Sequence, residues 1–338
     1  LLTLGFEMMG TGPALRAPAA NYASLRLLSA PAVLLTYTAV GWFIGRQDTR
    51  WPMRILIITN VVNIALDAVF ILGLGLASTG AAIATVMAEY VGLVVAIVGL
   101  RKQWTSLLSV SLWRQLRIFR PYLRLLRNNV NLFLRTLTLL FAFAFFTAAG
   151  ENLGADVVAA NAVMMQFLLF AAFAMDGFAY AAEGLAGEAL GSGDLKRFFA
   201  VSRRCTLWTA GSALVISALI LLGKPWLFPL LTGLPEVLAI MHAQGAWLVA
   251  LPLIAAPSYL LDGLFIGAGA TRAMMLSMLC SALLIYLPCW YLTTGLENDG
   301  LWLSFAVFNA SRGVTLTMSF VYFTRQNRWQ HWSQDPAA

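Results

Sequence analysis

Charged side chains are scarce in this chain of 338 residues: only 11% are Asp, Glu, Lys or Arg, whereas soluble domains average roughly 25%. Hydrophobic residues make up 60% of the sequence, and apolar runs of about 20 residues recur along its whole length. This composition excludes an ordinary soluble domain. Because the runs are continuously apolar rather than alternating, they indicate an all-α polytopic membrane protein.

Residues that commonly carry catalysis or bind metals are also few. The three cysteines, Cys205, Cys280 and Cys289, lie in or beside apolar runs without metal-ligand spacing, and the two histidines are isolated. The sequence has no Walker motif, no HExxH or GxSxG motif and no TVGYG-like ion filter. These absences argue against an enzyme and an ATP-driven pump. They leave an ion gradient or a partner chain as the energy source, with H⁺ or Na⁺ as the coupling ion and no organic cofactor.

Nine complete membrane spans can be drawn from the apolar runs. Two of them exceed the thickness of a bilayer, so we expect them to tilt, kink or project into water. The nine spans cover residues 22–45, 53–74, 78–100, 128–150, 155–190, 199–223, 238–270, 272–294 and 300–324.

Basic residues alternate from one loop to the next. Every second loop holds most of the Lys and Arg, whereas the loops between them hold acids such as Glu151, Asp156 and Glu297. By the positive-inside rule, the basic loops and the C-terminus are cytoplasmic. Membrane topology therefore accounts for the formal net charge of +7, and we expect no nucleic-acid partner.

The longest connection, residues 103–127, is basic with interleaved apolar residues, and we expect an amphipathic helix on the inner membrane face. It separates two similar halves. The run from Ala30-Pro31 to Thr49-Arg50 resembles the run from Ala256-Pro257 to Thr271-Arg272, and Gly80 is matched by Gly300. A parallel repeat of helix bundles is a transporter architecture. The expected domains are 1–102, the later part of a first lobe; 103–127, the linker; 128–325, a second lobe; and 326–338, a cytoplasmic tail.

The repeat also predicts how many helices the whole protein has. The second lobe contains three spans ahead of its repeated triplet, so the first lobe should have three as well. Only the tail of one of them fits in Leu1–Gly10. We therefore expect this chain to be an N-terminal truncation of a twelve-span protein with two six-helix lobes.

Asp67 is an unusual residue in its span, because Ile55–Leu74 contains no other charge. Asn63 lies one helical turn before it, and Thr85 lies at a similar depth in the next span, which a short loop makes an antiparallel neighbour. We expect the three side chains to converge. A buried carboxylate is costly, and this set of oxygens suits a hard cation such as Na⁺ or a proton relay. The alternative is a structural polar contact between two helices.

The second half contains further buried charges. Asp176 and Glu183 lie two helical turns apart on one face among small residues, and Asp262 is a third acid. Two cations, Arg135 and Arg312, lie within spans, and Arg312 needs a partner, either Asp262 or Asp176. Two interpretations stay open: a second coupling or substrate site, or an ion pair that stabilises the bundle.

Several of these strings resemble the multidrug and toxic compound extrusion (MATE) family of transporters, in particular its DinF-like branch. The strings in the first half are Tyr22-Ala-Ser-Leu-Arg26-Leu-Leu-Ser-Ala-Pro31, Asn60-Val-Val-Asn63-Ile-Ala-Leu-Asp67 and Gly80-Ala-Ala-Ile-Ala-Thr85. Those in the second half are Asp176-Gly-Phe-Ala-Tyr-Ala-Ala-Glu183 and Leu261-Asp262-Gly-Leu-Phe-Ile-Gly. The resemblance extends over nearly the whole chain.

The resemblance implies a MATE-type pair of six-helix lobes that exports cationic or amphipathic compounds, driven by inward proton or sodium flow. In prokaryotic relatives, the first-lobe cation site combines an Asn, an Asp, a Thr and an aspartate of the first helix. The first three match Asn63, Asp67 and Thr85, and the fourth has no counterpart here, so we expect an incomplete site. Asp262 lies on a helix that carries functional acids in some relatives. The resemblance further implies a bacterial inner-membrane monomer whose partners are a small organic substrate and the bilayer.

Two other functions remain possible on the sequence alone. A flippase for a lipid-linked precursor would need buried cations for an anionic head group, and Arg26, Arg135 and Arg312 are candidates. A membrane scaffold without transport activity would tolerate loss of both Asp67 and Asp176.

Overall fold

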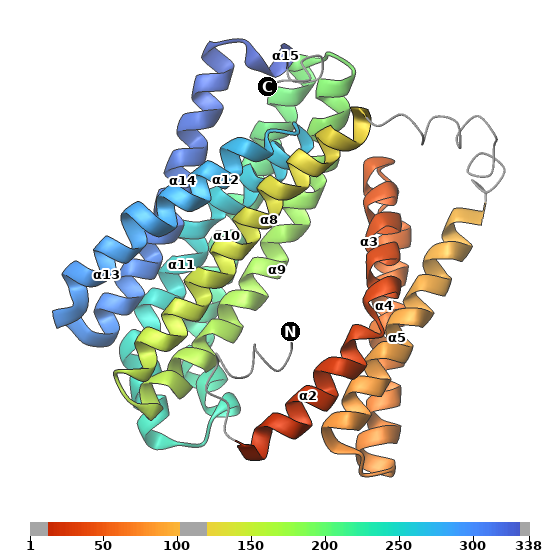
Figure 1. Cartoon of the computed structure of the whole chain (residues 1–338). Coiled ribbons are helices and arrows are strands. Elements are labelled where there is room, and N and C mark those ends of the chain that lie inside the picture. The colour runs from red at the N-terminus through yellow and green to blue at the C-terminus, as the bar shows by residue number, and fades with distance from the viewer. Residues whose placement is uncertain (1–12, 102–119, 332–338) are drawn as a thin grey trace. The chain divides into compact units, whose positions relative to one another are not determined.

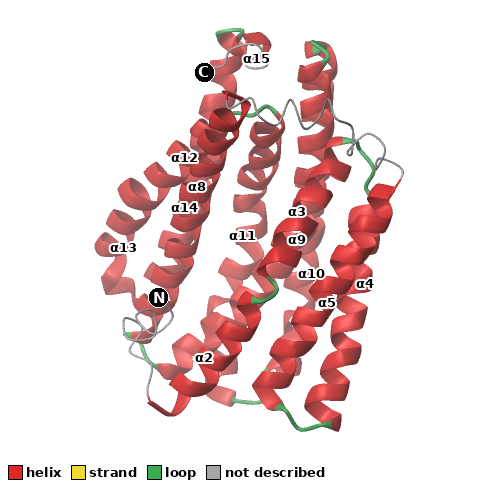
Figure 2. Cartoon of the chain, turned by 45° about the vertical axis from the view of Figure 1, so that its right-hand side comes forward, coloured by secondary structure: helices red, strands yellow, loops and turns green. Residues whose placement is uncertain are grey.

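The computed structural model describes residues 13–101 and 120–331, and this part of the chain consists of helices joined by short loops, without a strand (Figures 1 and 2). It divides into two compact units, Leu1–Ile118 and Phe119–Ala338. The division falls within the segment 103–127, which we predicted to be a linker; residues 102–119 of that segment lie outside the described part.

The first unit is organised around helix α5 (Ala77–Leu100), which contacts the other three helices. These are α2 (Pro13–Leu27), α3 (Ala30–Gly45) and α4 (Arg50–Asp67), and α4 continues into a π-helical stretch, η1 (Ala68–Gly73). The residues of α5 that are buried are all glycine or alanine. Small residues let helix backbones approach closely in a membrane protein, where apolar burial gives little advantage over contact with lipid.

The second unit is a larger bundle. Its first four helices are α8 (Arg120–Glu151), α9 (Ala155–Gly191), α10 (Leu195–Leu231) and α11 (Pro235–Gly267). A bent stretch follows, made of α12 (Thr271–Leu279), the π-helical η3 (Cys280–Tyr286), α13 (Leu287–Thr293) and the 3₁₀ turn η4 (Thr294–Leu296). The chain then folds back as α14 (Glu297–Arg325), and the short α15 (Arg328–His331) ends the described part.

These helices account for the nine expected spans. Seven helical stretches are long and apolar enough to cross a membrane, and the pair α2–α3, bent by 50°, makes an eighth. One of the seven, Thr271–Arg325, reverses direction at Glu297, which has φ of 52°, so its two arms correspond to two spans. The prediction of a polytopic α-helical membrane protein is confirmed.

The structure adds detail at two of the predicted boundaries. Residues 120–127, which we assigned to the linker, form the first turns of α8. Residues 326–338, which we described as a tail, include α15, whose Trp329 is only 2% exposed and packs on Phe198, Phe320 and Phe323. The Trp329 Nε1 donates a hydrogen bond of 2.9 Å to Thr324 Oγ1. The last described helix is therefore tied to the bundle by an aromatic cluster.

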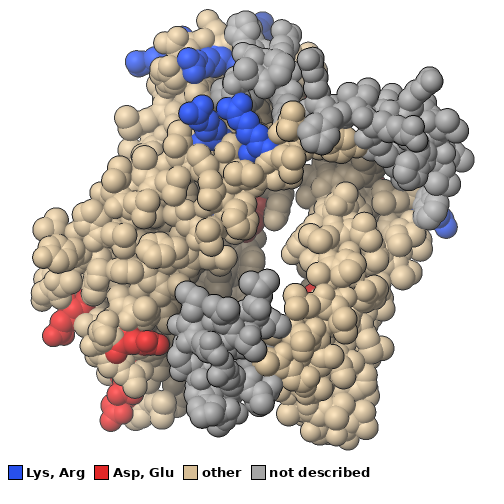
Figure 3. Space-filling model, in the orientation of Figure 1, with Lys and Arg blue, Asp and Glu red and all other residues tan. Residues whose placement is uncertain are grey.

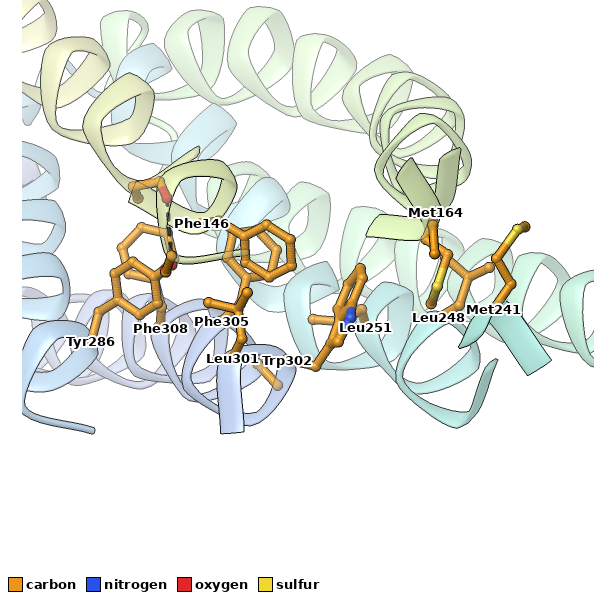
Figure 4. Close-up of a cluster of buried hydrophobic side chains, with 14 of the residues drawn as sticks. Phe146, Met164, Met241, Leu248, Leu251, Tyr286, Leu301, Trp302, Phe305 and Phe308 are labelled. Atoms are coloured by element: carbon orange, nitrogen blue, oxygen red, sulfur yellow. Dashed lines mark hydrogen bonds between the residues drawn. The ribbon is translucent and has the colours of Figure 1, made fainter. Parts of the chain in front are cut away.

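The core of the second unit is aromatic where α8, η3 and α14 meet (Figure 4). Phe146 packs edge-on against Trp302 at 4.9 Å between ring centroids, and Tyr286 packs on Phe308 at 5.3 Å. The Tyr286 hydroxyl donates to the backbone carbonyl of Ala142 at 3.4 Å. Such pairs prefer tilted or edge-to-face geometry, and these contacts fix the register of α8 against α14.

Helices α9 and α11 approach each other closely through Gly263 and Gly267. A Cβ atom added at Gly263 would overlap the backbone of Ala179, and one added at Gly267 would overlap the backbone of Glu183. No rotamer change can relieve a clash with backbone, so the absence of a side chain at these positions sets the distance between the two helices.

We therefore predict that Gly263→Ala lowers the free energy of unfolding of the second unit by about 1–3 kcal/mol, because α9 and α11 must separate. Gly177→Ala, on α9, is the matched control, since nothing lies within 4 Å of a Cβ atom there. The measurement is the thermal unfolding midpoint in detergent. A Gly263→Ala protein as stable as the control would contradict the close packing.

The predicted repeat has a counterpart in backbone geometry. In the first unit the Asp48 amide donates to Phe43 O at 2.9 Å, with Gln47 at φ of 58°. In the second unit the Ala270 amide donates to the carbonyl of Phe265 at 2.8 Å, with Gly269 at φ of 74°. Both are Schellman turns at the end of a helix, and in each the residue with positive φ lies two residues before a Thr-Arg pair. The repeated sequence thus forms the same helix–turn–helix connection twice.

Exposed charges in the second unit lie largely at opposite ends of the helices, according to their sign (Figure 3). The start of α10 carries Lys196, Arg203 and Arg204, and the start of α12, at the same end of the bundle, carries Arg272. Acids such as Glu297 lie at the other end. This segregation follows the alternation seen in the sequence; that the basic end faces the cytoplasm stays a prediction.

Candidate functional sites: a polar helix face and a charged cavity

The first unit brings two of the three predicted site residues into contact. Asn63 Nδ2, on α4, donates a hydrogen bond of 3.3 Å to Thr85 Oγ1, on α5. Asp67 follows Asn63 by one turn on the same face of α4. Its Oδ1 atom is buried and has no hydrogen-bond partner among the described residues.

The surroundings of these side chains are those of a membrane helix. Asn63 and Asp67 are half-buried, whereas Val61, Ile64 and Val69 are 59%, 69% and 53% exposed. The polar groups are thus covered while the apolar residues point outward. This is the reverse of a water-soluble helix and the arrangement expected where lipid surrounds the protein.

The oxygens of Asn63, Asp67 and Thr85 that have hydrogen-bonding capacity left can only accept. The Thr85 hydroxyl donates to Ala81 O at 2.8 Å and accepts from Asn63 Nδ2, which leaves it one lone pair. The carbonyl oxygen of Asn63 and Oδ1 of Asp67 accept no hydrogen bond from a described residue. A carboxylate, an amide oxygen and a hydroxyl can hold Na⁺, or the carboxylate can take up a proton.

The repeat does not reproduce this polar set in the second unit. With Thr49-Arg50 aligned to Thr271-Arg272, Asn63 and Asp67 correspond to Ile285 and Cys289. With Gly80 aligned to Gly300, Thr85 corresponds to Phe305, which belongs to the aromatic core. The two units have therefore diverged at these positions, one to polar groups and the other to hydrophobic packing.

The buried charges of the second unit form a triad centred on Asp262. Its Oδ2 atom accepts hydrogen bonds from a guanidinium nitrogen of Arg135 and, at 2.9 Å, from one of Arg312. Arg312 is 3% exposed, and its guanidinium also donates to Asn309 Oδ1 at 3.3 Å and lies over the Phe308 ring. Of the two partners expected for Arg312, the structure selects Asp262.

Asp176 and Glu183 line a cavity of about 330 Å³ together with this triad. Neither carboxylate forms a hydrogen bond or ion pair with another residue in the described part of the chain. Most of the remaining lining is apolar and comes from α8, α9, α11 and α14. With both arginines committed to Asp262, the cavity wall carries two unpaired carboxylates in an apolar setting.

The third cation suggested for a flippase is also paired. Arg26 forms a two-pronged ion pair with Glu89, at 2.9 and 3.0 Å. Arg26 is thus paired with Glu89, whereas Arg135 and Arg312 share the single carboxylate of Asp262. Because Asp176 and Glu183 line the same cavity as these two arginines, acids outnumber cations there, which disfavours an anionic head group. Through its pair with Arg26, Glu89 links α2 to α5.

One buried polar cluster was missed by sequence reasoning. Asn161, on α9, exchanges two side-chain hydrogen bonds with Asn298, on α14, at 2.8 and 3.2 Å, and accepts a third from Trp302 Nε1 at 2.9 Å. Two asparagines near the same end of apolar spans were the available signal. Because its amide groups satisfy one another, the cluster is a structural contact between helices.

Comparisons with known proteins agree with one another. The MatE family model matches residues 4–69 and 132–292. The chain is 36% identical to DNA damage-inducible protein F of Escherichia coli over 340 residues, covering 97% of this chain and 72% of that protein. It is 27% identical to Protein DETOXIFICATION 43 of Arabidopsis thaliana, covering 93% of this chain and 59% of that protein.

Solved structures agree in fold. The Vibrio cholerae MATE transporter VcmN in its bent form is similar with a TM-score of 0.82 at 23% identity, covering 96% of this chain and 74% of that one. An outward-facing multidrug resistance MATE family transporter is similar with a TM-score of 0.79 at 19% identity. At these identities the likeness shows the fold alone.

Proposed function

Because this chain belongs to the MatE family of transporters and is a multi-pass membrane protein, not an enzyme, we propose that it acts as a secondary antiporter for cationic or amphipathic organic compounds. Export would be driven by inward flow of H⁺ or Na⁺, by alternating access of two helical lobes. The proposal places the protein in a bacterial inner membrane as a monomer, with its C-terminus in the cytoplasm. The names of its relatives, with detoxification and multidrug resistance among them, support this class of substrate.

The observation that carries the proposal is the unpartnered, buried Oδ1 of Asp67 beside the Asn63–Thr85 pair. A buried carboxylate without a partner costs several kcal/mol, and a bound proton or cation removes most of that cost. The occupied and empty forms therefore differ in energy, and this difference can bias the packing of α4 against α5. An ion gradient can drive a conformational change only if the ion-occupied and empty forms of the site favour different conformations.

The second-unit cavity is our candidate for part of the substrate site. Its volume lies near the lower end of the range for small-molecule sites, about 300–1,000 Å³. Asp176 and Glu183 supply negative charge to an apolar wall, which suits an amphipathic cation. The aromatic rings of Phe143 and Phe173, also in the lining, can contact the apolar part of such a compound.

The test of the proposed function is transport by the full-length protein in proteoliposomes. Uptake of a fluorescent cationic dye is measured under an imposed proton gradient, an imposed sodium gradient, or neither. We expect the dye to accumulate against its own concentration gradient only when the imposed H⁺ or Na⁺ gradient drives ions out of the vesicles. Movement of equal rate and extent under all three conditions would rule out an antiporter.

We further predict that Asp176→Asn combined with Glu183→Gln weakens the transport of a dicationic dye by about tenfold or more, because the cavity loses both unpaired charges. An uncharged amphipathic substrate should be affected by less than about threefold, since its apolar contacts are unchanged. The measurement is the apparent KM for each substrate. Equal losses for the charged and uncharged substrates would argue against a charge-recognition site.

A further inference from the structure

A second charged pocket lies at the end of the first unit where α3 turns into α4 and α5 ends. It has a volume of about 380 Å³ and is lined by four arginines, Arg46, Arg50, Arg54 and Arg101, with Asp48 as the only acid among its lining residues. This pocket is separate from the polar face around Asp67, which lies toward the other end of α4.

The arginines have little internal counter-charge, since Asp48 is the only acid among the lining residues. None of the four forms an ion pair with a described residue, and the nearby carboxylate, Asp48, already accepts a hydrogen bond of 3.2 Å from the Arg50 backbone amide at the start of α4. The adjoining sequence, residues 102–127, contains further Lys and Arg and no Asp or Glu. All four arginines are exposed, so an anionic ligand can reach them and balance their remaining charge.

The pocket is held in shape by aromatic packing. Trp51 stacks on Phe43 at 5.9 Å, and the Arg54 guanidinium lies over the Trp51 ring at 5.0 Å. Gly99 allows this packing, because a Cβ atom there would lie 2.8 Å from both rings. At least one guanidinium is thus oriented before any anion binds, which lowers the entropic cost of binding.

Apolar surface adjoins the pocket along the same helices. Ile57 and Ile58, one turn past Arg54 on α4, are 51% and 37% exposed. Ile97 and Val98, one turn before Arg101 on α5, are 40% and 44% exposed. A ligand with a phosphate in the pocket and hydrocarbon along these helices would satisfy both surfaces, which a free phosphate would not.

We propose that this pocket binds the phosphate group of an anionic phospholipid in the membrane leaflet at the basic ends of the helices. Guanidinium groups pair with phosphate oxygens in a two-pronged geometry, and basic pockets between membrane helices suit acidic head groups. The site is independent of ion coupling at Asp67. It gives the first unit a lipid-dependent contact beside the turn that connects α3 to α4.

The test is lipid binding by the full-length protein in detergent, measured by native mass spectrometry with added phosphatidylglycerol or phosphatidylcholine. We expect the wild-type protein to retain phosphatidylglycerol in preference to phosphatidylcholine. Arg50→Gln with Arg54→Gln should weaken this retention by about tenfold or more. The control, Arg203→Gln with Arg204→Gln, removes two exposed arginines at the basic end of the second unit and should leave the preference within about twofold.

Three results would overturn the proposal: equal retention by wild type and the Arg50/Arg54 variant, an equal loss in the control, or displacement of the lipid by millimolar inorganic phosphate. The last would identify a site for free anions. Size-exclusion chromatography checks folding of each variant. If the glutamine variant aggregates, Arg50→Lys with Arg54→Lys keeps the charge but not the two-pronged geometry, and retention should fall by at least about threefold.

Discussion

Replacement of Asp67 by asparagine is expected to reduce ion-driven export by at least about tenfold while leaving the protein folded. The amide has nearly the same shape as the carboxylate, but it carries no charge and cannot take up a proton or neutralise Na⁺. Since Oδ1 of Asp67 has no hydrogen-bond partner among the described residues, the substitution leaves no partner group unpaired there.

The same variant also gives a prediction for the stability of the protein. A carboxylate that is costly to bury is replaced by a neutral group, so the unfolding midpoint should stay the same or rise. The measurements are dye efflux from cells that express the full-length protein and thermal unfolding in detergent. Asp156→Asn, at an exposed acid in the first turn of α9, is the control and should change neither value. Undiminished efflux by Asp67→Asn would refute a coupling role.

Replacement of Asp262 by alanine, unlike that of Asp67, is expected mainly to destabilise the protein. It should lower the free energy of unfolding by about 3–5 kcal/mol. Asp262 is the shared partner of Arg135 and Arg312, and Arg312 is 3% exposed. Without the carboxylate, two guanidinium groups remain close together in a poorly solvated interior. We expect a strongly reduced unfolding midpoint and a low yield of monodisperse protein.

The Arg197–Glu188 pair provides the matched control for this effect. It is also an arginine–carboxylate pair, with distances of 2.8 Å, but both side chains are 43% exposed. Glu188→Ala should therefore cost no more than about 1 kcal/mol, because water solvates the remaining arginine. If Asp262→Ala were as mild as Glu188→Ala, the triad would not stabilise the bundle, and Asp262 would be available as a cation ligand.

Asp67 and Asp262 are thus assigned different roles on one criterion, the presence of a partner. Asp262 is neutralised inside the protein, and its loss should mainly cost stability. Asp67 has an oxygen without a partner, and its loss should mainly cost function. Buried charges that proteins retain without compensation are commonly functional, because selection for stability alone would remove them.

The sequence predicted the helices well because a membrane imposes a long apolar run on each span. It was less informative where composition does not change at a boundary. Residues 120–127 keep the same mixture of Arg and Leu that precedes them, so the start of α8 at Arg120 could not be seen. The docking of Trp329 depends on contacts with distant helices, which no local pattern encodes.

Within the sites, sequence spacing predicted residues on one helix better than contacts between helices. Asn63 and Asp67 are one turn apart, and the short loop after η1 made Thr85 a reachable neighbour. The choice of Asp262 over Asp176 as the partner of Arg312 depends on the relative register of α9, α11 and α14. That register is set by the backbone approach at Gly263 and by the aromatic core, not by the spacing of the charges.

The most direct test of the central claim is substrate-driven ion movement through the full-length protein in proteoliposomes. A cationic substrate is added outside vesicles that contain a pH-sensitive or a sodium-sensitive dye. We predict that substrate entry through the wild-type protein causes loss of luminal H⁺ or Na⁺, and that Asp67→Asn shows no such loss. Substrate-dependent ion loss at the wild-type rate in Asp67→Asn vesicles would contradict the assignment of Asp67 as the coupling carboxylate.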